Sequence, residues 1–355
     1  MILSELLKGV TYSELKGDSN ADVLALTYDS RTVGEGYCFF AVAGTVVDGH
    51  NFIASAIERG AKVVICQHIP EEVAGKATFV VVEDTNLAMG IVAANFYGNP
   101  SRELKVVGVT GTNGKTTIAT LLYELVQSMG HKAGLISTVV YKVGAKEIES
   151  THTTPDAIRL NAMMREMVDE GCEYCFMECS SHAIVQQRIH GLHFTGALFT
   201  NITHEHLDYH KTFAEYIRAK KSLFDSLPKS AFALVNADDR NGEVMLQNTK
   251  ASRYTISLQK MADFRAKVIE MMVEGMELRI DNKEVWVQFL GRFNAYNLLT
   301  VYGAALLLGF EKEDILAHLS MLRPVSGRFE TVLAKDGTTA IVDFAHTPDA
   351  LENII

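Results

Sequence analysis

Apolar and polar positions follow two periods along this chain. Short apolar runs of strand-like composition alternate with longer stretches in which apolar residues recur at helical spacing. Such alternation is typical of an α/β protein with largely parallel sheets. Near the N-terminus it predicts strands at Cys38–Val42, Lys62–Cys66 and Phe79–Val82, and helices at Asn51–Arg59 and Asn86–Tyr97.

Two interruptions of this pattern predict domain boundaries. Gly98-Asn99-Pro100-Ser101 ends the first alternation, and a buried strand at Leu104–Val109 follows it. Arg323-Pro324 interrupts a later helical pattern, and a strand at Thr339–Asp343 comes next. We expect an α/β N-terminal domain, a central domain with a mostly parallel sheet flanked by helices, and the beginning of a truncated α/β C-terminal domain. Their predicted ranges are 1–100, 101–324 and 325–355. Within the central domain, Lys267–Gln288 predicts a small antiparallel insert.

Composition narrows the class of protein. The 355 residues are 48% hydrophobic and 21% charged, which excludes a disordered or low-complexity chain. A net charge of -10 argues against nucleic acid or an anionic membrane as the main partner. No apolar run is long enough for a membrane span, and five cysteines, an odd number, do not make a disulfide framework. We therefore predict a cytoplasmic enzyme without membrane insertion or an obligate protein partner.

The strongest chemical signal is a glycine-containing loop between a strand and a helix. Its glycines let backbone N–H groups turn onto phosphate oxygens, and the helix N-terminus adds a positive dipole end. Lys115 would reach the β- and γ-phosphates, and the Thr116 hydroxyl would bind Mg²⁺. Val109 stands where the usual spacing has glycine, so the loop is a variant. The predicted ATP-binding residues here are Gly111, Thr112, Asn113, Gly114, Lys115, Thr116 and Thr117.

Two later segments carry further candidate ligands. The apolar strand Tyr174–Glu178 ends in a carboxylate that suits a second metal contact. Three histidines and two acids lie close together in the run Asn201–His210, a composition that fits a transition metal or a hard cation. No N-K-x-D sequence occurs, which argues against a guanine-nucleotide switch. The spacing of Cys172, Cys175, Cys179 and His182 could suggest zinc, but we favour a core role for these cysteines.

Lys220 is the most testable single residue. Thr212 to Glu215 has the pattern of a capping box, which opens a helix. Lys220 falls on the apolar face of that helix, whereas Lys221 is predicted to point away. A lysine placed in this way either extends its amine back to water or is held inward for chemistry.

Five runs in the chain together resemble the Mur ligase family, the ATP-dependent amide-forming enzymes of peptidoglycan synthesis. In family order they are Thr110–Thr117, Glu178–His182, Asn201–His210, Gly291–Asn297 and Val342–Ala350. Asp29-Ser30-Arg31, the run Gly44–His50 and the run His152–Asp156 are similar to the branch that adds the third residue of the stem peptide, the MurE type.

The resemblance implies both chemistry and residues. It implies ATP and Mg²⁺ as cofactors, and UDP-N-acetylmuramoyl-L-alanyl-D-glutamate and a diamino acid as substrates. Lys115, Glu178, His206 and Lys220 would be catalytic. Thr116, Glu178, His206 and a carbamylated Lys220 (N6-carboxylysine) would hold Mg²⁺. Asn294, Asn297, Arg328 and Asp343 would contact ATP, although helix capping is an alternative role for the two asparagines. The implied substrate contacts are Ser30, Thr45, Val46, Val47, Thr153, Thr154, Ser180, Gln186 and Arg188.

Alternatives remain open at this point. A neighbouring ligase of the MurF or folylpolyglutamate type, and a non-catalytic nucleotide-dependent binding module, share part of the pattern. The sequence leaves meso-diaminopimelate and L-lysine open as the added residue. We expect this chain alone to bind the UDP-substrate and to ligate poorly or not at all.

Overall fold

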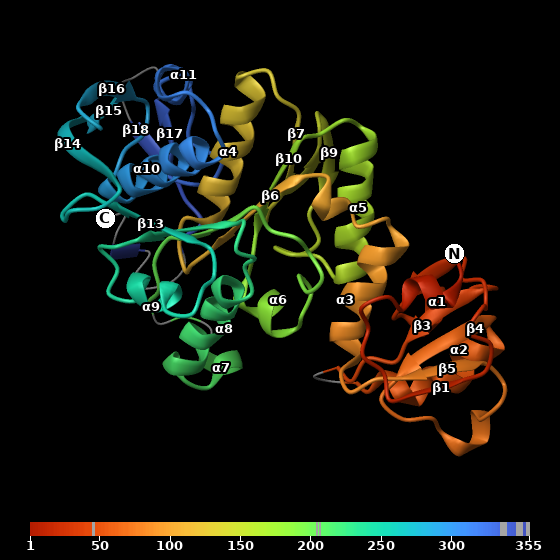
Figure 1. Cartoon of the computed structure of the whole chain (residues 1–355). Coiled ribbons are helices and arrows are strands. Elements are labelled where there is room, and N and C mark those ends of the chain that lie inside the picture. Colours follow the sequence, from red (N-terminus) through yellow and green to blue (C-terminus); the bar gives the residue numbers. More distant parts are fainter. Residues whose placement is uncertain (45–46, 204, 206, 334–338, 346–350, 353–355) are drawn as a thin grey trace. The chain divides into compact units, whose positions relative to one another are not determined.

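The computed structural model describes residues 1–44, 47–203, 205, 207–333, 339–345 and 351–352 (Figure 1). Two compact units make up the chain. The first comprises Met1–Glu103, Pro155–Glu166 and Val185–Leu192, and the second comprises the remaining residues. One helix, α5 (Ala157–Asp169), contributes residues to both.

The first unit is built on one five-stranded sheet in the order β1-β5-β4-β3-β2. Only the β1–β5 pair is antiparallel. Its elements are α1 (Leu3–Leu6), β1 (Glu14–Lys16), β2 (Ala25–Thr27), β3 (Tyr37–Phe40), α2 (Ile53–Glu58), β4 (Ala61–Cys66), β5 (Thr78–Val81) and α3 (Thr85–Phe96).

Both faces of this sheet are covered, which explains its continuous apolar strands. Val63 and Ile65 of β4 pack with residues of α1 and α3 on one face. Val64 and Cys66, the alternate positions, pack with residues of α2 on the other face. The strands predicted at the positions of β3, β4 and β5 are confirmed within one or two residues. The short β1 and β2 were missed, because strands of three residues give too little periodicity.

The second unit contains an eleven-stranded sheet in the order β16-β15-β14-β13-β12-β11-β6-β10-β7-β8-β9. Its strands are β6 (Lys105–Thr110), β7 (Ala133–Ile136), β8 (Val140–Val143), β9 (Lys146–Glu149), β10 (Tyr174–Glu178), β11 (Gly196–Phe199), β12 (Phe232–Asn236), β13 (Ser252–Ser257), β14 (Phe264–Met272), β15 (Gly275–Ile280) and β16 (Lys283–Val287). Its helices are α4 (Lys115–Ser128), α6 (Ser181–Val185), α7 (Leu207–His210), α8 (Phe213–Asp225), α9 (Gly242–Leu246), α10 (Arg292–Leu307) and α11 (Lys312–Leu319).

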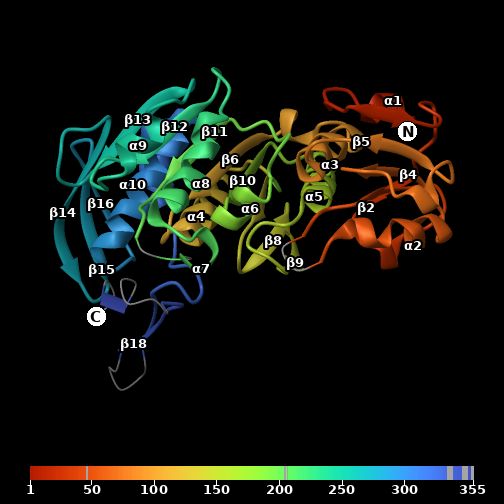
Figure 2. The same cartoon turned by 90° about the horizontal axis from the view of Figure 1, so that it is seen from below.

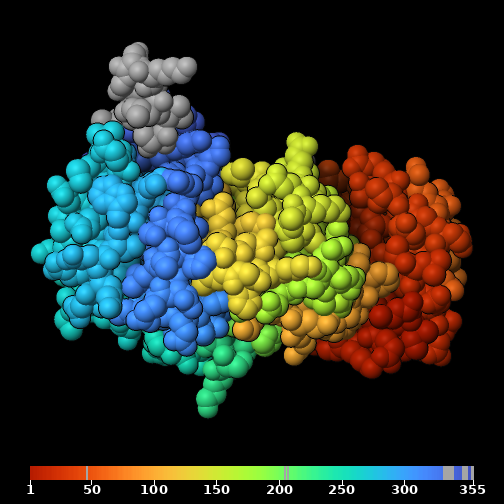
Figure 3. All heavy atoms as spheres, turned by 90° about the horizontal axis from the view of Figure 1, so that it is seen from above, coloured from red at the N-terminus to blue at the C-terminus, as the bar shows by residue number. Residues whose placement is uncertain are grey.

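Helices cover the two faces of this sheet (Figures 1 and 2). α4, α10 and α11 pack together over one face, and their surfaces lie side by side in the space-filling view (Figure 3). α8 and α9 pack against each other on the opposite face, where α9 contacts β12. The central strands β7, β10, β6, β11, β12 and β13 are parallel, so their carboxyl ends share one edge. After β6, the chain adds β7 and β10 on one side of this strand and then β11, β12 and β13 on its other side. Ligands bind at such switch points in open α/β sheets.

The antiparallel insert predicted at Lys267–Gln288 is partly confirmed. β14, β15 and β16 do pair antiparallel. However, β14 also pairs parallel with β13, so these strands extend the central sheet instead of forming a separate insert. Near the C-terminal end, β17 (Glu330–Leu333) pairs antiparallel with β18 (Thr339–Val342), where a strand was predicted.

All five cysteines are buried and unpaired. Removal from water disfavours the thiolate and raises the pKa of the Cys66 thiol to about 11. Within the described residues, no helix is both long and apolar enough to cross a membrane.

Candidate functional site

The phosphate loop lies between the end of β6 and the start of α4, as predicted. Gly111 and Gly114 both have positive φ, at 148° and 89°. A Cβ on Gly111 would come within 1.8 Å of Thr200 Oγ1, and one on Gly114 within 2.6 Å of Asn297 Oδ1. Glycine is therefore required at both positions by the neighbours of the loop as well as by its backbone.

Residues from the end of β11 hold the loop in place. Asn201 accepts from the Thr112 N–H at 2.8 Å through its carbonyl and from the Asn113 N–H at 3.0 Å through its side chain. Thr200 Oγ1 donates to the Asn113 carbonyl at 2.6 Å. The loop thus depends on contacts with residues about ninety positions later in the chain.

Two lysine amines meet at one backbone oxygen. Lys115 Nζ donates to the carbonyls of Gly111 at 3.0 Å and Thr112 at 2.7 Å. Lys220 Nζ donates to the same Gly111 carbonyl at 2.7 Å. The surrounding protein excludes water and lowers the pKa of Lys115, while the carboxylates of Glu178 and Glu205 act in the opposite direction.

Lys220 is held inward, so its amine does not extend back to water, which was one of the two predicted placements. Its side chain is only 1% exposed, and its amine lies 4.4 Å from the centre of the Tyr216 ring. Burial lowers its pKa well below the ordinary value, and the positive charge of Lys115 lowers it further. Lys220 therefore favours the neutral amine.

The helix that carries Lys220 is capped as predicted, but its next residue was misjudged. Thr212 Oγ1 accepts from the Glu215 N–H at 3.2 Å and opens α8. Lys221 does not point away into solvent. It is buried, and its amine contacts both carboxylate oxygens of Asp225, one helical turn later. An ion pair within the helix compensates the burial of this second lysine.

Glu178 ends β10 with a buried carboxylate. Its Oε1 accepts from the Thr138 N–H at 2.7 Å, and its Oε2 accepts from the Thr138 hydroxyl at 3.2 Å. The Glu178 carbonyl accepts from Thr154 Oγ1 at 2.7 Å, and Thr154 Oγ1 in turn accepts from the Ser180 N–H at 3.2 Å. Two predicted substrate residues of this unit, Thr154 and Ser180, are thus connected to Glu178, and a third, Thr153, lies 3.1 Å from the Thr138 hydroxyl.

The predicted asparagines do not cap their helix. Asn294 donates to the Leu290 carbonyl at 2.8 Å and accepts from Asn297 Nδ2 at 3.0 Å. Asn297 lies against Gly114 of the phosphate loop. The helix N-cap is Gly291, and no side chain bonds to the first turn there. Asn297 therefore belongs to the surroundings of the loop.

Arg328 and Asp343 are placed differently from each other. Arg328 Nη2 donates to Thr116 Oγ1 at 3.1 Å, and its guanidinium lies over the Phe344 ring. Asp343 accepts from the backbone N–H groups of Phe329 and Ala345, each at 2.6 Å. Arg328 thus touches the phosphate loop directly, whereas Asp343 organises the segment that carries it.

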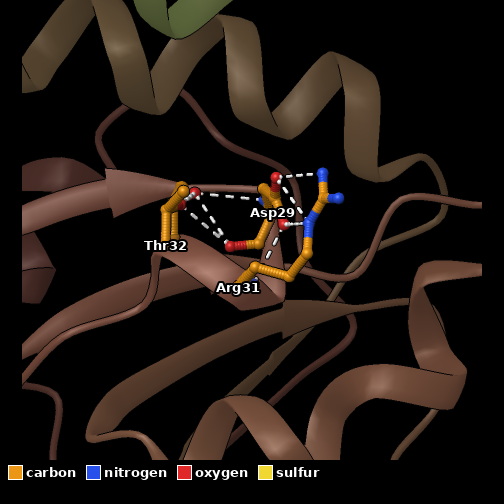
Figure 4. A network of polar contacts seen from close by, with 4 residues as sticks. Asp29, Arg31 and Thr32 are labelled. Carbon is orange, nitrogen blue, oxygen red and sulfur yellow. Dashed lines mark hydrogen bonds and ion pairs between the residues drawn. The ribbon is translucent and has the colours of Figure 1, made fainter.

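The first unit holds the remaining substrate candidates. Asp29 caps the short turn Ser30–Thr32 and accepts from the backbone and guanidinium of Arg31 (Figure 4). These hydrogen bonds lower the pKa of Asp29. Val47 is exposed, and its carbonyl accepts from the Gly44 N–H at 3.1 Å. In the same unit, Gln186 Oε1 accepts from the Arg188 guanidinium at 2.6 and 3.0 Å.

Thr45, Val46 and His206 lie outside the described residues, so their predicted contacts stay predictions. Of the other two histidines in that run, His204 is also outside, and His210 Nε2 lies 2.9 Å from Ser181 Oγ. Within the described part of the chain, no group of three or more His, Cys, Asp or Glu side chains could hold a metal ion.

Sequence reasoning assigned no role in the site to Thr138, Thr200 and Tyr216. Tyr216 OH lies 3.2 Å from Thr112 Oγ1 and supports both the loop and Lys220. One signal was available for Thr138 and Thr200. Thr200 directly follows β11, and Thr138 lies two residues after β7, and both are parallel strands of the central sheet. No comparable signal marked Tyr216, which reads as an ordinary apolar helix position.

Two family descriptions match the chain. The Mur ligase middle domain matches residues 109–305, and the catalytic domain of the Mur ligase family matches residues 22–97. The UDP-N-acetylmuramoyl-L-alanyl-D-glutamate–2,6-diaminopimelate ligases of Phocaeicola vulgatus and Parabacteroides distasonis are each 54% identical to it over 355 residues. The alignment covers 100% of this chain and 73% of each relative. The Clostridium acetobutylicum ligase of the same name is 38% identical.

Solved structures give the same picture of the fold. A UDP-N-acetylmuramoyl-L-alanyl-D-glutamate–2,6-diaminopimelate ligase superposes with a TM-score of 0.85 at 27% identity, covering 99% of this chain and 72% of that one. MurF from Acinetobacter baumannii has a TM-score of 0.70 at 20% identity, covering 99% and 75%. A folylpolyglutamate synthase from Mycobacterium tuberculosis, complexed with ADP, has a TM-score of 0.61 at 16% identity, covering 76% and 68%.

Proposed function

The chain belongs to the Mur ligase family, and on that premise we propose that it serves the ATP-dependent addition of 2,6-diaminopimelate to UDP-N-acetylmuramoyl-L-alanyl-D-glutamate. The observation that carries this proposal is identity of 54%, over the whole chain, to relatives that bear this ligase name. The gathering of Lys115, Lys220 and Glu178 at one sheet edge supports it, because the reaction requires charge neutralisation there.

The proposed reaction has two steps. In the first step, an oxygen of the D-glutamate carboxylate bonds to the γ-phosphorus of ATP, and the bond between this phosphorus and the bridging oxygen breaks. The products are an acyl phosphate and ADP. The amine of the diamino acid then bonds to the acyl carbon, phosphate leaves, and the amine loses a proton. Phosphoryl transfer of this kind depends on positioning and electrostatics more than on covalent chemistry by the protein.

This chain supplies the cradle for the phosphates. The N–H groups of the loop and of the first turn of α4 would bind phosphate oxygens, and Gly114 in its left-handed conformation aims them. Lys115 donates hydrogen bonds to loop carbonyls in this structure, and it would exchange them for contacts with the β- and γ-phosphates. Anionic phosphates would also raise the lowered pKa of Lys115 and keep it charged.

Mg²⁺ fits the residues present. The Thr116 hydroxyl and the Glu178 carboxylate are hard oxygen donors, the kind that Mg²⁺ prefers. The Arg328 guanidinium donates to the Thr116 hydroxyl, and it would give up this contact to the metal. We therefore propose Thr116 and Glu178 as ligands, with His206 and carbamylated Lys220 from the family resemblance. When bound, Mg²⁺ would neutralise charge on the phosphate oxygens.

Lys220 is suited to carbamylation. Its neutral amine can bond to the carbon of CO₂ with loss of one proton, which yields an anionic carbamate. The buried position favours the uncharged nucleophile. The same position places the modified end beside Gly111 and near Lys115, whose positive charge would stabilise the new anion.

The alternatives are not favoured. MurF and folylpolyglutamate synthase structures lie at 20% and 16% identity, which establishes a shared fold alone. A non-catalytic module would not require two lysines with lowered pKa values beside a phosphate loop.

Calorimetric binding of UDP-N-acetylmuramoyl-L-alanyl-D-glutamate to this chain tests the proposal, with UDP-N-acetylmuramoyl-L-alanine as the matched control. We expect selective binding of the dipeptide compound. Equal affinity for both compounds, or binding of neither, would contradict the assignment of the substrate.

A further inference from the structure

Thr138 grips both oxygens of the Glu178 carboxylate. Thr138 lies two residues after the end of β7, the strand next to β10 in the sheet (Figure 1). Its backbone N–H donates to Glu178 Oε1 at 2.7 Å, and its hydroxyl lies 3.2 Å from Glu178 Oε2. A carboxylate held on both oxygens by one residue cannot rotate freely, so its remaining lone pairs have a fixed direction.

The turn that carries Thr138 is itself braced. Ser137 Oγ donates to the Val140 carbonyl at 2.8 Å and accepts from the Val140 N–H at 3.2 Å. Ser150 Oγ donates to the Ser137 carbonyl at 2.9 Å. These bonds fix the backbone on both sides of Thr138, so its two hydrogen bonds to the Glu178 carboxylate are preorganised.

The same hydroxyl connects Glu178 to a predicted substrate residue. Thr138 Oγ1 lies 3.1 Å from Thr153 Oγ1. The Thr138 hydroxyl has one proton and two acceptors within reach, Glu178 Oε2 at 3.2 Å and Thr153 Oγ1 at 3.1 Å, and the carboxylate is the stronger acceptor of the two. The segment that carries Thr153 is held by Tyr141, whose hydroxyl accepts from the His152 N–H at 3.0 Å.

We propose that Thr138 is a positioning residue of the ligase reaction, which orients the Glu178 carboxylate for the metal and ties it to the substrate segment at Thr153. This inference rests on the proposed function, because it takes Glu178 as a metal ligand. Residues that orient a ligand in this way commonly change metal affinity by 10- to 100-fold when they are replaced.

The test uses Mn²⁺ as the metal probe and ADP as the nucleotide, with the affinity for Mn²⁺ measured by titration of the ADP-bound chain. Thr138→Val keeps the shape and the backbone N–H but removes the hydroxyl. We expect it to weaken Mn²⁺ binding about 10-fold, with metal-free ADP affinity unchanged. Thr138→Ser restores a hydroxyl and is expected to lie within about threefold of the unmodified chain.

Thr85→Val is the matched control, because the Thr85 hydroxyl is buried and has no hydrogen-bond partner among the described residues. It should leave Mn²⁺ binding unchanged. Thr138→Ala is made in parallel, so that a folding failure of one variant leaves the measurement to the other.

Glu178→Gln separates the two proposals. If it leaves Mn²⁺ affinity unchanged, the metal role of Glu178 fails and the inference fails with it. If Glu178→Gln weakens binding while both Thr138→Val and Thr138→Ala do not, the inference alone is overturned. Equal loss of Mn²⁺ affinity in Thr138→Ser and Thr138→Val would likewise reject a role for the hydroxyl.

Discussion

The phosphate-loop site and the Asp29 turn hold their polar groups in opposite ways. At the loop, Lys220 is 1% exposed and contacts Gly111, 109 positions earlier in the chain. At the turn, Arg31 is largely exposed and contacts Asp29, two positions away. The first arrangement exists only when the whole second unit is folded, whereas the second is nearly complete within one turn of chain.

This difference determines how strongly a single substitution in each region changes ligand binding or the free energy of unfolding. A buried amine loses hydration, so its state depends on every neighbour that surrounds it. An exposed ion pair keeps most of its hydration and contributes little to stability. Single substitutions should therefore have large effects at the loop and small effects at the turn.

Lys115→Met should give the largest effect. Removal of its positive charge leaves the phosphates of a bound nucleotide without their buried partner, and we expect MgATP affinity to fall about 100-fold. Lys105→Met is the matched control, since Lys105 is exposed at the start of β6, the strand that leads into the phosphate loop. Equilibrium titration with a fluorescent ATP analogue measures both. A loss of less than threefold for Lys115→Met would remove this residue from the nucleotide site.

Gly114→Ala should follow, through stability. The new Cβ meets Asn297 Oδ1 in a left-handed backbone conformation, and we expect the free energy of unfolding to fall by about 2 kcal/mol. Gly130→Ala shares the φ of 89° but has open space around the new Cβ, so about 1 kcal/mol is expected there. Urea unfolding of both variants gives the difference. Equal losses would mean that the close approach of α10 to the loop costs nothing.

Lys220→Met should stabilise the fold by about 1 kcal/mol at neutral pH, because a buried ionisable group is replaced by an apolar one of similar length. The pKa of Lys220 is lower in the folded chain than in the unfolded chain. The unfolded chain therefore binds more protons between the two pKa values, and stability rises with pH there. Lys220→Met should flatten that rise, while Lys221→Met should keep it. Urea unfolding between pH 6 and 9 tests both, and an unchanged slope in Lys220→Met would contradict the burial argument.

Asp29→Ala should have the smallest effect, roughly 0.5–1 kcal/mol of unfolding free energy, since it removes a cap and an exposed ion pair. The pKa of Asp29 is lowered in the folded chain, so its contribution is present above the unfolded pKa and is lost as pH falls through the folded pKa. The two proteins should therefore converge in stability in acid, as followed by thermal unfolding. A loss above about 2 kcal/mol would show that the turn depends on distant contacts after all.

The sequence predicted what local patterns encode. The α/β class, the strands β3 to β6, the loop between β6 and α4, and the cap at Thr212 all depend on residues close together in the chain. The 3.6-residue period also placed Lys220 on the apolar face, but it left open whether the amine returns to water, and only the family resemblance favoured the inward position.

What failed depends on partners that periodicity does not reveal. Lys221 was expected in solvent, but an acid four residues later allows its burial. Helix capping was the alternative role considered for Asn297, and only the folded structure brings this residue to Gly114. Thr138 was missed because its role arises from the register between β7 and β10, two strands separated in sequence by more than a helix.

The buried cysteine thiols can report local unfolding of the chain through their reaction with an alkylating reagent. Cys38 and Cys66 lie in the first unit, and Cys172, Cys175 and Cys179 in the second. Burial raises the pKa of all five, so an alkylating reagent finds almost no thiolate until the surrounding structure separates. Brief alkylation followed by peptide mass analysis would then time the loosening of each unit separately, without any introduced label.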